Sequence, residues 1–263
     1  MPSKLFTEIA EISRNAALRA GEALKKRYGT VFTISIKPDA GLLTEVDLES
    51  EEIIISEIRK TRPADAILAE ESGIVSELRG ESSFRWIIDP LDGTTNFAHG
   101  VPHFAVSIGV EYEGNVVSGV VFNPMTGELF EAVKGKGATL NGKSVHVSGA
   151  EQIEESLLAT GFSYQKGEIV DQELAVLSRV LHHVRAVRRI GSAALDLCYV
   201  AVGRFDGFWE YDLSPWDIAA GVLLVTEAGG KVSSMSGGPY LLEEGSIVAS
   251  NGKIHQTLIE MLR

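Results

Sequence analysis

The stretch WIIDPLDGTTNF, from Trp86 to Phe97, combines an apolar run, a turn and several polar residues. Its apolar start is typical of a buried strand, and Asp89 stands where that strand would end. Pro90 and Gly93 predict a tight turn, which leaves Asp92 above the same strand end. The residues after the turn carry hydroxyl groups and backbone N–H groups that suit an oxyanion at the start of a helix. This one stretch therefore offers carboxylates for hard cations and donors for a phosphate.

Two further acidic positions adjoin predicted elements. Glu70 directly follows a short apolar strand predicted over 66–69, and Glu71 comes next. Because side chains alternate along a strand, only one of the pair is expected to point inward, and we favour Glu70. Adjacent carboxylates repel each other unless a cation or hydrogen bonds compensate. Asp217 begins an Ala- and Gly-rich helix predicted over 216–228, where it can cap the helix and also point into a site.

The charge balance is acidic, since 24 basic and 36 acidic residues give a formal net charge of -12. An acidic surface repels phosphate unless cations stand between them, so phosphate-binding features in such a chain indicate a metal site. No basic stripe appears, and we expect no direct nucleic-acid partner. The single cysteine, Cys198, lies in an apolar stretch, so we expect it in the core, without an intramolecular disulfide and in a reducing compartment.

The N-terminal residues lack the apolar core of a signal peptide. No apolar run approaches the roughly 20 residues that a membrane-spanning helix needs. We therefore expect a cytoplasmic protein that does not enter a membrane.

Hydrophobic periodicity gives the first part of the chain, about 1–150, two helices and a strand-rich section. The helices are predicted over 5–27 and from Thr44 to Pro63, on either side of a polar loop with Lys37, Pro38, Asp39 and Gly41. The strand-rich section resembles one antiparallel sheet with turns at Gly114-Asn115 and Asn141-Gly142. Its strands are predicted over 66–69, 84–88, 104–112, 116–122 and 129–133.

In the second part, about 151–263, strands and helices alternate. Strands are predicted over 157–160, 184–188, 207–210, 231–233 and 246–249, and helices over 173–182, 192–202 and 216–228. Asn251 is predicted to cap the last helix. We expect a single domain over 1–263, built from two sheets with helices around and between them.

The strings Trp86–Phe97 and Trp216–Gly221 resemble the two signature motifs of the inositol monophosphatase family. The resemblance covers nearly the whole chain in order and spacing. It implies a layered αβαβα sandwich of the α+β or α/β class and a homodimer. It also implies Mg²⁺-dependent hydrolysis of phosphate monoesters, often inhibited by Li⁺, with two or three metal ions and with Mn²⁺ as a substitute.

Position by position, the resemblance also implies roles for particular residues. The metal ligands would be the side chains of Glu70, Asp89, Asp92 and Asp217 and the carbonyl of Leu91. Glu70 and Thr94, the latter paired with Asp47, would orient the attacking water. The substrate would contact Asp92, Gly93, Thr94, Thr95, Gly191, Ser192, Ala193, Glu210 and Asp217. The loop around Lys37 loosely matches a mobile lid.

The favoured reaction is hydrolysis of myo-inositol 1-phosphate by metal-activated water, and several alternatives stay open. Relatives with similar ligands act on histidinol phosphate, fructose 1,6-bisphosphate, NADP or 3′-phosphoadenosine 5′-phosphate. Glu210 weakly favours a polyol pocket, and the short chain weakly disfavours the bisphosphatases. A regulatory, partner-binding protein could also retain this fold. A plain calcium-binding module is the weakest alternative, because Gly100 stands where an EF-hand needs its bidentate Glu.

Overall fold

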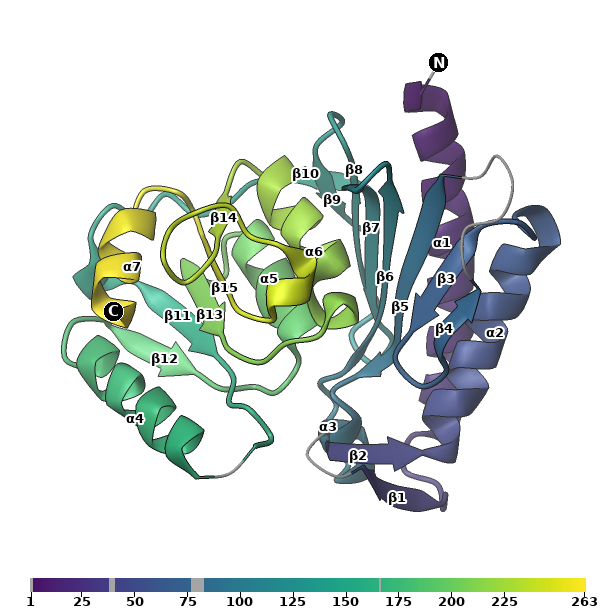
Figure 1. The fold of residues 1–263 in the computed structure, drawn as a ribbon, viewed down its shortest axis with the longest axis horizontal. Coiled ribbons are helices and arrows are strands. Elements are labelled where there is room, and N and C mark those ends of the chain that lie inside the picture. Colours follow the sequence, from purple (N-terminus) through teal and green to yellow (C-terminus); the bar gives the residue numbers. More distant parts are fainter. Residues whose placement is uncertain (1, 38–40, 77–82, 166) are drawn as a thin grey trace.

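A computed structural model of the chain describes residues 2–37, 41–76, 83–165 and 167–263. Its layers run from a pair of helices through a large sheet, a second pair of helices and a smaller sheet to a third pair of helices (Figure 1). This confirms the two sheets, with helices around and between them, that the sequence patterns predict, and the layered αβαβα sandwich that the resemblance implies. No helix in the described ranges is both long and apolar enough to cross a membrane.

The first layer consists of α1 (Pro2–Arg27) and α2 (Glu45–Thr61), which cover the outer face of the large sheet (Figure 1). Ile9, Leu24 and Ile54 of these helices are fully buried in the core that they share with the sheet. Both helices lie where hydrophobic periodicity predicts them, and Thr44 is the N-cap of α2.

The segment between these helices forms an antiparallel hairpin of β1 (Ile34–Lys37) and β2 (Gly41–Thr44). The sequence predicted a polar loop here. That prediction is wrong for residues 34–37 and 41–44, which form the two strands. Ile34 and Ile36 of β1 are 48% and 81% exposed, so pairing rather than burial holds the strand. No burial pattern was therefore available to predict it. Pro38 and Asp39, named in the same loop, lie outside the described residues.

The large sheet has eight strands in the order β10-β9-β8-β7-β6-β5-β3-β4. They are β3 (Ala66–Ala69), β4 (Gly73–Ser76), β5 (Phe84–Asp92), β6 (Ala105–Tyr112), β7 (Asn115–Asn123), β8 (Glu128–Val133), β9 (Ala138–Leu140) and β10 (Lys143–Val145). The β6–β7 turn is formed by Glu113 and Gly114, both with positive φ, one residue earlier than predicted. Between β5 and β6 lies the short helix α3 (Thr94–Ala98).

The prediction of one antiparallel sheet is wrong at a single pair of strands, because β3 and β5 run parallel. The chain between them first adds β4, antiparallel to β3 at the edge of the sheet, and then returns. As a result β3 and β5 end at the same side, with Ala69 paired to Ile88. This detail brings Glu70 next to Asp89.

The middle layer consists of α5 (Ala193–Ala201) and α6 (Pro215–Glu227), packed between the two sheets (Figure 1). Glycines let α6 approach the large sheet closely. A Cβ on Gly109 would lie 2.6 Å from the Ala219 Cβ, and one on Gly119 would lie 2.7 Å from the Ala220 carbonyl oxygen. Cys198 of α5 is fully buried in this core, as predicted.

The smaller sheet has the order β12-β11-β13-β15-β14, and α4 (Glu168–Leu181) and α7 (His255–Leu262) cover its outer face (Figure 1). Its strands are β11 (Leu157–Thr160), β12 (Ala186–Arg188), β13 (Gly207–Glu210), β14 (Lys231–Ser233) and β15 (Ile247–Ser250), with short 3₁₀ helices η1 (Ile153–Glu155) and η2 (Leu242–Glu244) nearby. The prediction that Asn251 caps α7 is wrong. The N-cap is Ile254, and Asn251 instead accepts from the N–H groups of Lys253 and Ile254 before the helix begins.

Candidate active site

Asp89 lies at the centre of a group of four carboxylates. It is 2% exposed, near the end of the buried strand β5. Burial raises the pKa of Asp89 well above its usual range, and the nearby charges of Glu70, Asp92 and Asp217 raise it further. The four predicted carboxylates are therefore neighbours in space, although three separate segments of the chain supply them.

A bulge in β5 orients two of these carboxylates alike. Asp89 pairs with Ser107 of β6 and Asp92 with Ala105, so two residues of β5 face one residue of β6 between these pairs. On a regular strand, residues three apart point to opposite faces. The extra residue restores a common face for Asp89 and Asp92.

Glu70 reaches Asp89 because β3 and β5 are parallel and end together. The Glu70 N–H donates to the Ile88 carbonyl at 3.1 Å, which continues the ladder by one residue. A hydrogen bond joins the Glu70 and Asp89 carboxyl groups. Glu71 lines the same cavity as Glu70, against the expected alternation, since the chain leaves the strand at Ala69.

Asp92 joins the motif after β5 to the start of α5. Its Oδ2 accepts from the Ser192 hydroxyl and, at 2.8 Å, from the Ala194 N–H. It thereby satisfies N–H groups that the first turn of a helix leaves unpaired. Burial raises the pKa of Asp92 to about 6, and the bonds from Ser192, Ala194 and Ala193 oppose that shift.

Asp217 is the third residue of α6 and takes part in a capping box. Its Oδ2 accepts from the Ser214 N–H at 2.7 Å, and Ser214 is the N-cap residue. The sequence assigned a capping role to Asp217 itself, and the structure divides that role between the two residues. The carboxylate is held at the helix start, beside the other three.

The donor set suits a hard divalent cation such as Mg²⁺. It consists of four carboxylates and the Leu91 carbonyl, without Cys or His. A cation would also reverse the repulsion that raises the pKa of Asp89. Over the described part of the chain, no three His, Cys, Asp or Glu side chains are arranged so as to hold one ion. Oδ2 of Asp92 and Oδ2 of Asp217 already accept hydrogen bonds, from Ser192 and Ala194 and from Ser214 respectively.

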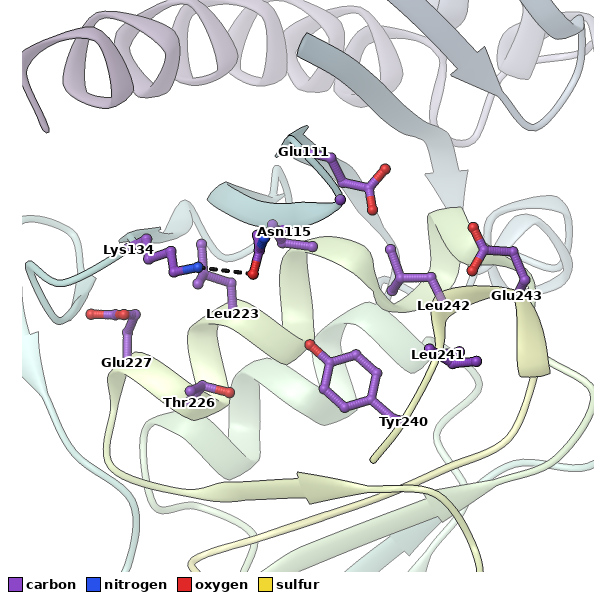
Figure 2. Close-up of a pocket in the computed structure, with 12 residues that line it drawn as sticks. Glu111, Asn115, Lys134, Leu223, Thr226, Glu227, Tyr240, Leu241, Leu242 and Glu243 are labelled. Atoms are coloured by element: carbon purple, nitrogen blue, oxygen red, sulfur yellow. Dashed lines mark hydrogen bonds between the residues drawn. The ribbon is translucent and has the colours of Figure 1, made fainter. Parts of the chain in front are cut away.

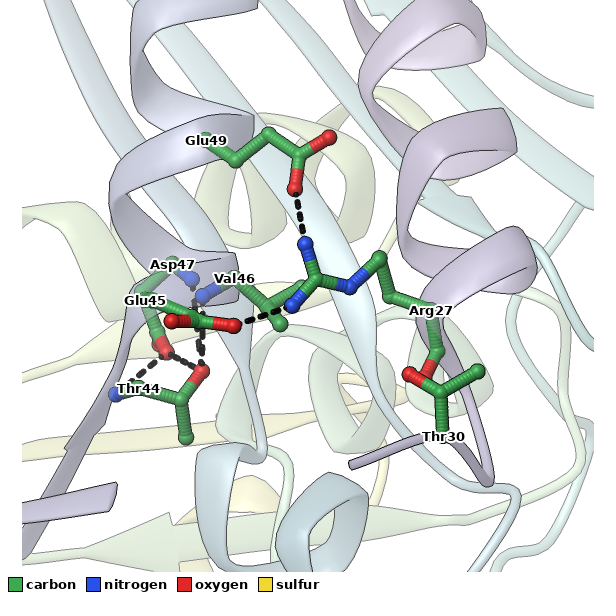
Figure 3. A network of polar contacts seen from close by, with 7 residues as sticks. All are labelled: Arg27, Thr30, Thr44, Glu45, Val46, Asp47 and Glu49. Carbon is green, nitrogen blue, oxygen red and sulfur yellow. Dashed lines mark hydrogen bonds and ion pairs between the residues drawn. The ribbon is translucent and has the colours of Figure 1, made fainter. Parts of the chain in front are cut away.

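Thr94 and Asp47 form a second part of the site. The Thr94 hydroxyl lies 3.0 Å from Asp47 Oδ1 and 3.0 Å from the Leu91 carbonyl oxygen. Asp47 is fully buried, and burial raises its pKa while bonds from Thr44 and Thr94 lower it. Figure 3 shows how its other oxygen accepts from the Thr44 N–H, at 2.8 Å, within the capping box of α2.

Figure 3 also shows Arg27, at the end of α1, paired with Glu45 and Glu49 of α2. These ion pairs fasten the start of α2, on which Asp47 lies. The position of Asp47 is therefore supported both within its own helix and from the neighbouring one.

The turn at Gly93 is packed against the segment before α5. Gly93 has a positive backbone φ of 93°. A Cβ at this position would lie 3.1 Å from the His103 carbonyl oxygen and 3.3 Å from the Gly191 carbonyl oxygen. The Asn96 amide donates to the carbonyls of His103 and Ile190 at 2.8 and 2.9 Å. The predicted phosphate-facing turn thus lies beside the predicted pocket residues Gly191, Ser192 and Ala193.

A cavity of about 500 Å³ adjoins the carboxylates, and Glu70, Asp217 and Glu210 all line it. This volume is in the range of small-molecule sites, about 300–1,000 Å³. Burial raises the pKa of Glu210 well above its usual range, and the charges of Asp196, Asp217 and Asp92 add to that effect. Tyr164 also lines the cavity, and its hydroxyl lies 3.5 Å from Thr95 Oγ1.

A second cavity, of about 360 Å³, lies between the β6–β7 turn, α6 and η2 (Figure 2). None of the predicted site residues lines it. Its acidic residues already have partners, since Glu227 accepts two backbone N–H groups at 2.8 Å and Glu111 and Glu243 pair with Arg85. The carboxylate cavity is therefore the candidate active site.

Sequence reasoning missed two residues at this site. Asp196 on α5 is 1% exposed, and among the described residues neither of its carboxylate oxygens has a hydrogen-bond partner. Burial and the charge of Asp92 raise its pKa well above the usual range. A lone acid in an otherwise apolar helix was a signal that could have identified it. Tyr164 lies in a loop, where no pattern marked it.

Comparison with known proteins extends these observations to the whole chain. The family model described as the inositol monophosphatase family matches residues 6–263. An inositol-1-monophosphatase from Mesorhizobium japonicum is 45% identical over 251 residues, which cover 94% of this chain and 93% of that protein. Nus factor SuhB from Pseudomonas aeruginosa is 44% identical over 256 residues, 96% of this chain and 94% of that protein.

A solved structure gives the same result. The crystal structure of the extragenic suppressor protein suhB from Bartonella henselae matches with a TM-score of 0.92 and 42% sequence identity, covering 97% of this chain and 98% of that chain. The fold, the site motifs and the full-length similarity agree, and the chain belongs to the inositol monophosphatase family.

Proposed function

We propose that this protein is a Mg²⁺-dependent phosphatase of small phosphate monoesters, with myo-inositol 1-phosphate as the favoured substrate. The observation that carries the proposal is the convergence of Glu70, Asp92 and Asp217 on the buried Asp89. Membership of the family supports a phosphatase that depends on metal.

The four carboxylates and the Leu91 carbonyl would hold two or three Mg²⁺ ions, or Mn²⁺ in their place. Bound there, divalent cations would neutralise the phosphate and make the attacking water more acidic. A phosphate monoester is already anionic and repels the acidic site. The same carboxylates therefore explain both the affinity for cations and the need for them.

Thr94 and Glu70 orient and deprotonate the attacking water in this proposal. When the Thr94 hydroxyl donates its hydrogen to Asp47, its oxygen can accept a hydrogen bond from water. Glu70 takes the proton as general base. The water oxygen then bonds to phosphorus opposite the ester oxygen. The P–O bond to the alcohol breaks, and the alcohol oxygen leaves with the electron pair and takes up a proton from solvent water.

The remaining residues bind the substrate. Backbone N–H groups of Gly93, Thr94 and Thr95 face the phosphate, since the first turn of α3 leaves them without partners in the helix. Gly191, Ser192, Ala193 and Glu210 face the alcohol. The Glu210 carboxylate accepts hydrogen bonds and so favours an alcohol rich in hydroxyl groups. A homodimer in the cytoplasm and inhibition by Li⁺ belong to the same proposal.

A second candidate function is binding of a protein partner. It is supported by the 44% identity, along nearly the whole chain, to a relative named Nus factor SuhB. Such a role does not need turnover, so it would persist in a variant that cannot hydrolyse the ester.

The test of the proposed function is phosphate release from a panel of monoesters. The panel holds myo-inositol 1-phosphate, histidinol phosphate, fructose 1,6-bisphosphate, NADP and 3′-phosphoadenosine 5′-phosphate, each with Mg²⁺ and with EDTA. We expect Mg²⁺-dependent turnover that is fastest on the inositol ester. Preference for another ester would contradict the substrate, and turnover unaffected by EDTA would contradict the metal mechanism.

A further inference from the structure

Gly161 and Glu210 lie against each other at the ends of β11 and β13 in the smaller sheet. We propose that Gly161 determines substrate specificity, because its missing side chain leaves the space in which the Glu210 carboxylate faces the substrate alcohol. The inference rests on the proposed function and assigns to that site a residue which itself carries no chemistry.

The two strands hold these residues side by side. β11 and β13 are parallel, with Thr160 paired to Trp209. The Thr160 hydroxyl also donates to the Trp209 carbonyl at 2.8 Å, which fastens the two strand ends together. The next residues along the chain are Gly161, just after β11, and Glu210, the last residue of β13, so these two lie side by side.

The Glu210 carboxylate occupies the space that a side chain at 161 would need. A Cβ built on Gly161 would lie 1.9 Å from Glu210 Oε1, 2.0 Å from its Cδ and 2.2 Å from its Oε2. These three atoms are at the far end of a flexible side chain. Gly161 has no positive φ, so its backbone accepts alanine without strain. A methyl group at 161 would therefore displace the Glu210 carboxylate rather than the backbone.

The Glu210 carboxylate is positioned by the space beside Gly161 and not by hydrogen bonds from other residues. Over the ranges that the structure describes, no residue donates a hydrogen bond to Glu210. Glu210 nevertheless lines the cavity together with Glu70 and Asp217. Its oxygens are thus available as acceptors for a ligand. The matching substrates are phosphate esters of polyols, which carry free hydroxyl groups close to the ester. An ester whose leaving group has no further hydroxyl gains nothing from Glu210.

The experiment compares two esters in the Gly161→Ala variant. One is myo-inositol 1-phosphate, and the other is 4-nitrophenyl phosphate, whose leaving group carries no further hydroxyl. We expect the ratio of their kcat/KM values to fall about 10- to 100-fold, as for loss of a hydrogen bond to a charged group. Gly149→Ala is the matched control, because a Cβ there meets nothing within 4 Å, and it should leave the ratio unchanged.

A double variant separates this mechanism from general damage. In a Glu210→Ala background, Gly161→Ala should cause no further loss, because the side chain that it displaces is gone. If Gly161→Ala alone unfolds, Glu210→Ala should restore the unfolding midpoint, and failure to do so would overturn the inference. An unchanged ratio in Gly161→Ala, or an equal loss in the Glu210→Ala background, would also overturn it. A wild-type protein that releases phosphate from neither ester would instead overturn the proposed function, and this inference with it.

Discussion

The Thr94 hydroxyl lies 3.0 Å from Asp47 Oδ1, although the two residues are 47 positions apart in the chain. This contact joins the start of α2 to the turn after β5. Its acceptor is buried and held in the capping box of α2, so the hydroxyl group is directed by a rigid partner. Under the proposed function, the pair fixes the orientation of the attacking water.

Replacing Thr94 should therefore affect turnover more than substrate binding. For Thr94→Ala we expect kcat to fall by about 10²- to 10⁴-fold with little change in KM, the range for loss of a group that assists proton transfer. Thr94→Ser keeps the hydroxyl and should retain most of the activity. Steady-state kinetics on the same ester checks both variants. An equal loss of kcat in Thr94→Ala and Thr94→Ser would show that the hydroxyl group does not assist turnover.

Mg²⁺ should stabilise the protein, and more so at neutral than at acidic pH. Burial and neighbouring carboxylates raise the pKa of Asp92 to about 6, so protons compete with cations for this site as the pH falls. At about 100-fold excess over the dissociation constant, a ligand of the native state adds about 2.7 kcal/mol of stability. Thermal unfolding with Mg²⁺ or EDTA should show a larger shift at about pH 7.5 than at about pH 5. A shift that is independent of pH would contradict this.

The stability of the fold without metal should also depend on pH through His255. Its ring is 1% exposed, and its nitrogens lie 2.9 Å from the hydroxyl oxygens of Ser250 and Ser233. Burial, and then the charge of Lys231, lower its pKa to about 4. In the unfolded chain the pKa is about 6.5. The unfolded state therefore takes up the proton first, and the stabilisation present above about pH 6.5 is lost as the pH falls toward 4.

Urea unfolding at about pH 7.5 and about pH 5 checks the contribution of His255. Wild type should lose more stability between these two conditions than His255→Gln. His183→Gln, on the exposed surface after α4, is the matched control and should behave like wild type. An equal loss of stability in all three proteins would show that His255 is not the source of the pH dependence.

Close packing of α6 on the large sheet should make Gly119 intolerant of a side chain. A Cβ there would lie 2.7 Å from the Ala220 carbonyl oxygen and 3.0 Å from the Ala220 Cα, which are backbone atoms that cannot rotate away. We expect Gly119→Ala to lower the free energy of unfolding by about 1–3 kcal/mol. The open-space variant Gly149→Ala should stay within about 0.5 kcal/mol of wild type in the same urea titration. A stable Gly119→Ala would mean that α6 can shift.

The elements predicted best are those in which the apolar residues of the sequence are also buried in the fold. The bounds of β3, β11 and β13 are as predicted, because each is a short and mostly buried apolar run. β1 and β4 were missed because their apolar residues are exposed, with Ile36 at 81% and Ile74 at 69%. Such strands are held by pairing with distant residues, which local periodicity does not report.

The site was predictable in its residue types but not in its geometry. The motif named Asp89 and Asp92, yet only the bulge opposite Ser107 and Ala105 explains how both share one face. The parallel pairing that brings Glu70 to Asp89 depends on the path of the chain through β4. These relationships arise from long-range packing, whereas the sequence records only the residue types that the packing brings together.

Phosphate release from myo-inositol 1-phosphate by Asp89→Asn tests whether the carboxylate group at Asp89 carries the proposed activity. This variant keeps the size of the buried side chain and removes the charge at the centre of the carboxylate group. We expect turnover with Mg²⁺ to fall by about 10³-fold or more, because metal-dependent chemistry cannot proceed without this ligand. Asp171→Asn, on the exposed surface of α4, should match wild type. Turnover by a folded Asp89→Asn protein at the wild-type rate would show that this carboxylate group is not the catalytic centre.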